Sequence, residues 1–157
     1  FKSTAIHEAG HAVVAHNLGG RCQITLERND RATWDDEKAV LGRIWLYGLS
    51  DHHSAAVGVA GIVAEKIAEG FGCVGGEVLD LFETGEISPS DRECVGDLRD
   101  KQLFQKIVDV RWLLEERTEQ HEAVVDALLE LNRKYPHEDC WVLTGHQVGE
   151  LLGGGEG

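Results

Sequence analysis

Hydrophobic residues recur every three or four positions through much of this chain, which is the spacing of helices that bury one face. Together with the residues that commonly begin and end helices, the pattern predicts helical stretches over residues 6–14, about 51–69, 91–114, about 119–135 and 144–152. Helices therefore account for most of the predicted structure.

Start and stop signals stand at the limits of these stretches. Ser3 or Thr4 can cap the first helix through its hydroxyl, and Gly19-Gly20 can end it. Ser88-Pro89 marks a helix start before the third stretch, and Thr144 can cap the last. The first helix is therefore bounded on both sides by its own sequence.

The second stretch is rich in small side chains, which allow another helix to approach closely. We therefore expect it to be a central helix packed against the first. Glu65 is the one acid in its apolar part, and we interpret it as a solvated position, with a contact to a ligand histidine as the alternative. Residues 70–76 indicate a break, and residues 77–86 are acidic with no assigned structure. The small residues of the predicted helix over about 51–69 are Ala55, Ala56, Gly58, Ala60, Gly61 and Ala64.

Two short runs have the composition of β-strands. Cys22–Leu26 is the first, a polar loop over residues 27–38 follows, and Leu41–Tyr47 contains the β-branched and aromatic residues that suit a strand. They predict a small antiparallel sheet beside the first helix, so the expected fold class is mainly α with a small β-sheet (α+β). An open outer strand could pair with an extended peptide, although an edge covered by its own loop is equally consistent with the sequence.

The size of the chain fits a single domain. With 157 residues, of which 42% are hydrophobic, we expect one domain over residues 1–152 and a flexible glycine-rich tail over residues 153–157. The four cysteines form no C-x-x-C pair, so a ribbon-type zinc site is not expected.

The net charge of −13 argues against nucleic acid and anionic membranes as partners, because their phosphates would be repelled. No apolar run approaches the roughly 20 residues of a membrane span, and Phe1-Lys2-Ser3 lacks the character of a signal peptide. The expected location is therefore cytoplasmic.

His7-Glu8-Ala9-Gly10-His11 carries the candidate chemistry of the first helix. Positions four apart lie on one face of a helix, so His7 and His11 can share one metal ion. Neutral imidazole is a good zinc ligand, and bound zinc lowers the pKa of its water to about 7. Glu8 is long enough to reach that water as a general base, whereas a partly buried helix whose histidines bind other polar groups is the alternative.

Two histidines hold zinc weakly, so a third ligand must come from another part of the chain. Asp91 lies at a helix start. The sequence supports two roles for it equally well, a metal ligand or an ordinary residue of the first helical turn. The candidate carboxylates are Glu65, Glu77, Asp80, Asp91 and Asp97.

The stretch from Thr4 to Ala15, TAIHEAGHAVVA, resembles the (A/T)-x-HEAGHA-(L/V)-V-A signature of the FtsH-type ATP-dependent zinc proteases. Gln23–Leu26 is similar to the strand that follows the zinc helix of that family, and Gly61–Glu65 is similar to its G-x-x-A-E-E segment. The family takes its third ligand from an aspartate at a helix start, which implies Asp91; Asp97, preceded by Gly96, is the alternative.

The chain also departs from that family. It contains no Gly-x-x-x-x-Gly-Lys-Ser/Thr loop, so it carries no ATPase of its own, and Lys66 stands where the family has a second acid. The resemblance implies a zinc-dependent metalloendopeptidase in which His7, His11 and Asp91 bind Zn²⁺ and Glu8 is the general base. Its expected substrate is an unstructured polypeptide segment lying along Leu41–Tyr47.

Two further alternatives stay open at this point. An ATPase supplied in trans is a partner that the missing loop allows, and the sequence does not fix an oligomeric state. The alternative to the enzyme is a non-catalytic interaction domain of the same fold, in which the metal is structural or lost.

Overall fold

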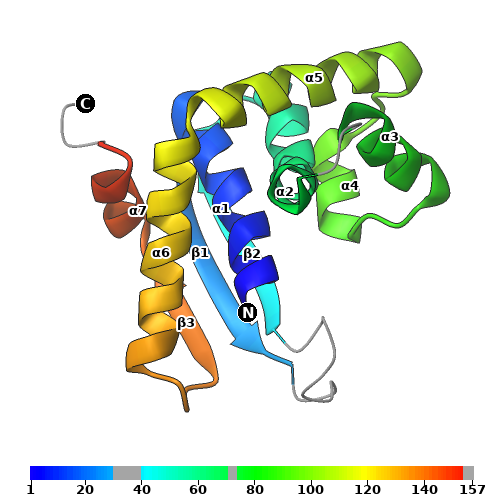
Figure 1. Cartoon of the computed structure of the whole chain (residues 1–157). Coiled ribbons are helices and arrows are strands. Elements are labelled where there is room, and N and C mark those ends of the chain that lie inside the picture. The colour runs from blue at the N-terminus through cyan, green and yellow to red at the C-terminus, as the bar shows by residue number, and fades with distance from the viewer. Residues whose placement is uncertain (30–39, 71–73, 154–157) are drawn as a thin grey trace.

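A computed structural model describes residues 1–29, 40–70 and 74–153 of the chain (Figure 1). Residues 30–38 of the predicted loop and residues 154–157 of the predicted tail therefore lie outside the described residues, whereas Glu27 and Arg28, predicted to be in that loop, belong to a strand. Its helices are α1 (Lys2–Asn17), α2 (Ser54–Glu69), α3 (Val74–Thr84), α4 (Pro89–Val95), α5 (Asp100–Glu116), α6 (Thr118–Lys134) and α7 (Gly145–Leu151), with a 3₁₀ turn at Asp51–His53, and its strands are β1 (Arg21–Arg28), β2 (Val40–Tyr47) and β3 (Cys140–Leu143).

The described residues form a mainly helical structure with a small three-stranded antiparallel sheet, so the predicted α+β class is confirmed. Buried side chains from all seven α-helices and from β1 and β3 join one hydrophobic core, and β2 packs partly buried side chains against it. None of the helices in the described ranges is both long and apolar enough to span a membrane.

Helix α1 contains the His-Glu-x-x-His motif and starts differently from the prediction. Phe1 occupies the N-cap position, and no side chain caps the helix. The Thr4 hydroxyl donates to the Val40 carbonyl at 2.9 Å, and the Ser3 hydroxyl donates to Glu65 at 3.2 Å. Both hydroxyls therefore join α1 to neighbouring elements, and the predicted capping by Ser3 or Thr4 is wrong.

The sheet has the order β2-β1-β3, so β2 is an edge strand. The two predicted strands pair in antiparallel register, with Ile24 opposite Ile44, and the third strand was not predicted. Helices α1 and α6 lie side by side over one face of this sheet (Figure 1). On that face Ile24 and Leu26 are fully buried, whereas Trp45 and Tyr47 are about half exposed on the opposite face.

Helix α2 packs against α1 and α4 at positions that have no side chain. A Cβ atom on Gly10 of α1 would lie 2.7 Å from the Ala60 carbonyl oxygen of α2. A Cβ atom on Gly58 would lie 3.0 Å from the Asp91 carbonyl oxygen of α4. The predicted packing of the central helix on the first is confirmed, and the same helix also brings α4 close.

The middle of the chain differs from the prediction. Residues 74–76, expected to be part of a break, belong to α3, which continues through the acidic stretch as far as Thr84 and buries Val78 and Phe82. The long helical stretch predicted after Asp91 is divided into α4 and α5 at Gly96, whose φ of 67° ends α4. Helix α4 is therefore short and can be oriented independently of α5.

Candidate metal centre

A cleft of about 770 Å³ separates the edge strand β2 from a wall formed by α2 and the start of α4. The motif residues His7, Glu8 and His11 of α1 also line this cleft. Asp91 and Glu65 line the opposite wall, so residues distant in the sequence meet in one cavity. Glu8, His11 and Asp91 are the buried polar or charged residues of the described chain.

The His11 imidazole is held from behind by the backbone of α2. Its Nδ1 atom lies 2.6 Å from the Val57 carbonyl oxygen, which can only accept, so Nδ1–H donates. In the neutral imidazole, Nε2 therefore carries a lone pair, and this atom lies 3.2 Å from Oδ1 of Asp91. Two acceptors repel each other at this distance in a buried site unless a proton or a metal ion lies between them.

His7 is oriented in the same way by a side chain. Its Nδ1 atom lies 3.0 Å from Oε2 of Glu65, and its Nε2 atom lies 3.0 Å from Oδ2 of Asp91. Such a carboxylate behind an imidazole fixes the tautomer and the direction of the ring. The Nε2 atoms of both histidines consequently point at the same carboxyl group.

Asp91 is placed by the start of α4. Ser88 is the N-cap residue, its hydroxyl accepts from the Asp91 amide at 3.3 Å, and Pro89 follows at the first helical position. The side chain of Asp91 points into the cleft, and the residue is only 8% exposed. The cap formed by Ser88 and the close packing of α4 against Gly58 of α2 together place the Asp91 carboxylate beside the two imidazoles.

These donors fit a zinc ion. Ligand atoms about 2.0–2.2 Å from a tetrahedral zinc are separated from one another by roughly 3.3 Å. The Nε2 atoms of His7 and His11 lie 3.0 and 3.2 Å from the Asp91 oxygens, which is close to that separation. Two imidazoles and one carboxylate are also a donor set that zinc binds in catalytic sites, with one position left open.

Glu8 is the other carboxylate that could serve as the third ligand. Among the described residues, His7, Glu8 and His11 form a group whose ligand atoms all lie within 4.8 Å of one another. Asp91 lies nearer, because it contacts both Nε2 atoms directly. We therefore favour Asp91 as the ligand, which leaves Glu8 free to act on a water molecule.

Glu8 is buried but has no polar partner in the described parts of the chain. It is 7% exposed, and its carboxyl group lies against the backbone of Gly42 in β2, where a Cβ atom would be 2.7 Å from Cδ of Glu8. Burial raises the pKa of Glu8 more than the neighbouring His11 and His7 lower it. A raised pKa suits a carboxylate that accepts a proton near neutral pH.

The charged forms of His7 and Asp91 stabilise each other. Burial alone would lower the pKa of His7, but hydrogen bonds to Asp91 and Glu65 outweigh it and raise the pKa to about 10. Burial would raise the pKa of Asp91, yet hydrogen bonds from His11 and His7 hold it well below its usual range. Without metal, a proton on His7 thus supplies the positive charge that Asp91 faces.

The other candidate ligands lie elsewhere. Glu77 and Asp80 belong to α3, and Asp97 is exposed in the turn after α4. None of the three lines the cleft around the histidines. Glu65, interpreted as a solvated position, contacts His7 instead, so that interpretation is wrong. The Val57 carbonyl and Gly42 had no signal in the sequence, because one is a backbone atom and the other acts by lacking a side chain.

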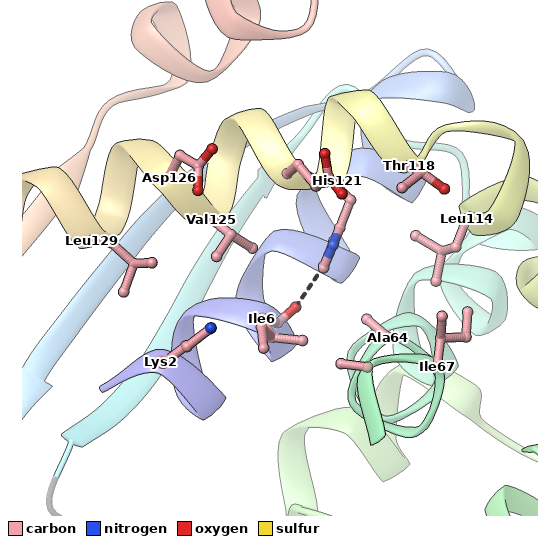
Figure 2. A pocket seen from close by; sticks show the side chains of 12 residues that line it. Lys2, Ile6, Ala64, Ile67, Leu114, Thr118, His121, Val125, Asp126 and Leu129 are labelled. Atoms are coloured by element: carbon pink, nitrogen blue, oxygen red, sulfur yellow. Dashed lines mark hydrogen bonds between the residues drawn. The ribbon is translucent and has the colours of Figure 1, made fainter. Parts of the chain in front are cut away.

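A second cavity, of about 390 Å³, lies between α1, α2 and α6 (Figure 2). Its floor is apolar and includes Ile67 and Val125. The imidazole of His121 is already used, because its Nε2 lies 3.0 Å from the Ile6 carbonyl oxygen. This cavity therefore lacks the convergent donors of the cleft around His7 and His11.

No protein-family model matches this chain, and no curated protein matches it either. Its function must therefore be inferred from the geometry of the site.

Proposed function

We propose that this chain is a zinc-dependent metalloendopeptidase of the His-Glu-x-x-His type. The observation that carries the proposal is the convergence of the Nε2 atoms of His7 and His11 on the carboxyl group of Asp91, at 3.0 and 3.2 Å. The similarity of the HEAGH segment to FtsH-type peptidase domains supports it, and so does the unpartnered carboxylate of Glu8 beside these residues.

His7, His11 and Asp91 would hold the zinc ion, which supplies Lewis acidity to a water molecule and to a peptide carbonyl oxygen. Glu65 and the Val57 carbonyl keep the two imidazoles in the required tautomer and direction. Glu8 accepts a proton from the attacking water and passes it to the departing amine. Its burial against Gly42 keeps this carboxylate close to the reacting atoms.

The edge strand β2 provides a surface for the substrate. Residues 40–46 line the cleft beside the metal ligands, and one side of this strand pairs with β1. The backbone groups on the other side can pair with an extended polypeptide. An unstructured segment fits this mode of binding, because its backbone N–H and C=O groups are not already paired within a fold.

Substitution of Glu8 by Gln tests the mechanism. The variant should retain about one zinc per chain and lose hydrolysis of an unfolded, casein-like protein by a factor of about 10² or more. Glu83→Gln, the same chemical change at an exposed position of α3, should behave as the wild type. Unchanged turnover in the Glu8 variant would contradict the assignment of the base.

Metal analysis tests the rest of the proposal. Protein purified without chelator should contain close to one equivalent of zinc. Full zinc without cleavage would favour a non-catalytic domain with a structural metal, and a chain that takes up no zinc would contradict the metal centre itself.

A further inference from the structure

Strand β2, the side of the cleft proposed to bind substrate, has two different faces. Along β2, Val40, Ile44 and Leu46 are partly buried toward α1, whereas the alternate residues Leu41, Arg43 and Trp45 are exposed on the other face of the sheet. Residues 40–46 all line the cleft. A peptide paired with β2 would place its alternate side chains beside these two rows in turn.

Arg43 differs from the other charged residues that line the cleft. These are the acids Glu8, Glu65, Glu86 and Asp91, so Arg43 is the one lysine or arginine among the described lining residues. Its partner across the sheet is the neutral Thr25. In the described parts of the chain its side chain takes part in no ion pair or hydrogen bond, including with Glu27, the nearest acid along β1. Its guanidinium group is therefore available to a ligand.

The neighbours of Arg43 on the same face are apolar. Leu41 is 49% exposed and Trp45 is 48% exposed, two residues before and two residues after Arg43. Exposed apolar patches on a protein surface commonly mark the sites where a partner binds. The outer face of the edge strand thus offers one positive charge between two apolar contacts.

We infer that the cleft selects extended peptides that carry an aspartate or glutamate opposite Arg43, with apolar side chains two residues to either side. This inference rests on the proposed function, since it describes the substrate of the same site. A guanidinium group binds a carboxylate through two parallel hydrogen bonds, and backbone pairing with β2 fixes which peptide side chain reaches it.

The expected preference is modest because Arg43 is exposed. Exposed ion pairs contribute little to binding, so a peptide with Glu at this position should bind about threefold more tightly than one with Gln. Lysine replaces attraction by repulsion, which gives a ratio of about tenfold between Glu and Lys. Both ratios should shrink as the salt concentration rises.

The test uses zinc-loaded protein that carries Glu8→Gln, so that peptides bind without being cleaved. Fluorescently labelled peptides of about ten residues, long enough to span β2, carry Glu, Gln or Lys at one central position between apolar residues. Their dissociation constants are measured by anisotropy with Arg43 intact and with Arg43→Glu or Arg43→Lys. Arg21→Glu is the matched control, because Arg21 is exposed on β1 opposite Tyr47 and does not line the cleft.

Tighter binding of the Glu peptide, reversal of the order in Arg43→Glu and retention in Arg43→Lys and Arg21→Glu are the expected results. Equal affinities, a preference for Lys, the same order in Arg43→Glu, or no binding of any peptide would each overturn the inference. Hydrolysis of the same peptides by the wild type is assayed separately. Binding with the expected preference but no hydrolysis would contradict the proposed function alone.

Discussion

A side chain on Gly61 of α2 would lie 2.6 Å from Nε2 of His11, so the two imidazoles of the candidate metal centre rest directly on the backbone of α2. The ring of His7 is equally near, since its Cδ2 atom would be 2.5 Å from the same added carbon. No real Cβ atom tolerates such contacts. The absence of a side chain at this position is therefore a requirement of the site.

Gly61→Ala should consequently abolish or greatly weaken zinc binding, because the added methyl group must displace at least one imidazole. We expect zinc affinity to fall by about tenfold to a hundredfold, measured by competition with a chromophoric chelator. Gly76→Ala is the control, because a Cβ atom there has nothing within 4 Å. Wild-type affinity in the Gly61 variant would show that the imidazoles bind metal from another position.

Asp91→Ala should remove the third ligand, whereas Asp97→Ala should not. Asp91 contacts both Nε2 atoms, and Asp97 is exposed beyond the end of α4. Zinc content after dialysis should fall well below one equivalent in the first variant and stay near one in the second. The opposite result would assign the ligand to the turn after α4.

Glu65→Gln should weaken zinc binding without removing a ligand. Glu65 accepts the Nδ1 proton of His7 at 3.0 Å, and partners of this kind change metal affinity by about 10-fold to 100-fold. Glu69→Gln lies on the same helix, where Glu69 pairs with Lys66, and should leave the affinity unchanged. Equal affinities in the two variants would mean that Glu65 does not orient His7.

Gly42→Ala should separate hydrolysis from metal binding. A Cβ atom there would lie 2.5 Å from Oε1 of Glu8, so the carboxylate must move while the three ligands stay in place. A displacement of about 1 Å can reduce turnover by about a hundredfold. Zinc content and kcat are both measured, with Gly149→Ala as a control because nothing surrounds its added carbon within 4 Å. Loss of zinc in the Gly42 variant would contradict this separation.

Zinc binding should release a proton near neutral pH. Hydrogen bonds to Asp91 and Glu65 outweigh the opposing effect of burial and raise the pKa of His7 to about 10 in the metal-free protein, so His7 is protonated at about pH 7.5. Zinc takes the neutral imidazole, so its affinity should rise with pH until the pH reaches about 10. Calorimetry in buffers of different ionisation enthalpy measures the released proton. Binding heats that do not vary with the buffer would contradict a protonated His7.

Several elements follow from the sequence because local signals agree with the packing. Thr144 and Gln147 form the capping box that starts α7, and the apolar spacing of α6 matches its buried face. The alternation in β2 reflects a strand with one face toward α1. In α6 and β2 the residues that determine the local structure are also those that bury its apolar surface, whereas the capping box of α7 acts through exposed polar side chains.

The missed elements depend on contacts between distant residues. Strand β3 is only Cys140–Leu143 and is stabilised by pairing with β1. Helix α3 contains Gly75 and Gly76, which are weak helix formers, and Phe82 and Val78 bury its face. Such elements are decided by tertiary packing, which no local pattern reports.

The candidate site also combines residues that follow from local spacing with residues that depend on contacts between distant parts of the chain. His7, Glu8 and His11 lie within five successive helical positions and could be placed together from their spacing alone. Five carboxylates were candidates for the third position, and only the resemblance to the FtsH-type family implied Asp91. Its position beside the imidazoles depends on the packing of α4 on α2 at Gly58. Glu65 reaches His7 across two helices, which helical position alone does not reveal.

The pairing of β3 with β1 also affects the order in which the molecule is completed. A ribosome makes the chain from its N-terminus at about 5–20 residues per second, so His7 and His11 emerge before Asp91, and Leu143 emerges later still. Until then β1 lacks its partner on the side away from β2. A growing chain therefore contains the three candidate ligands before the residues that complete the sheet beside β1 have been made.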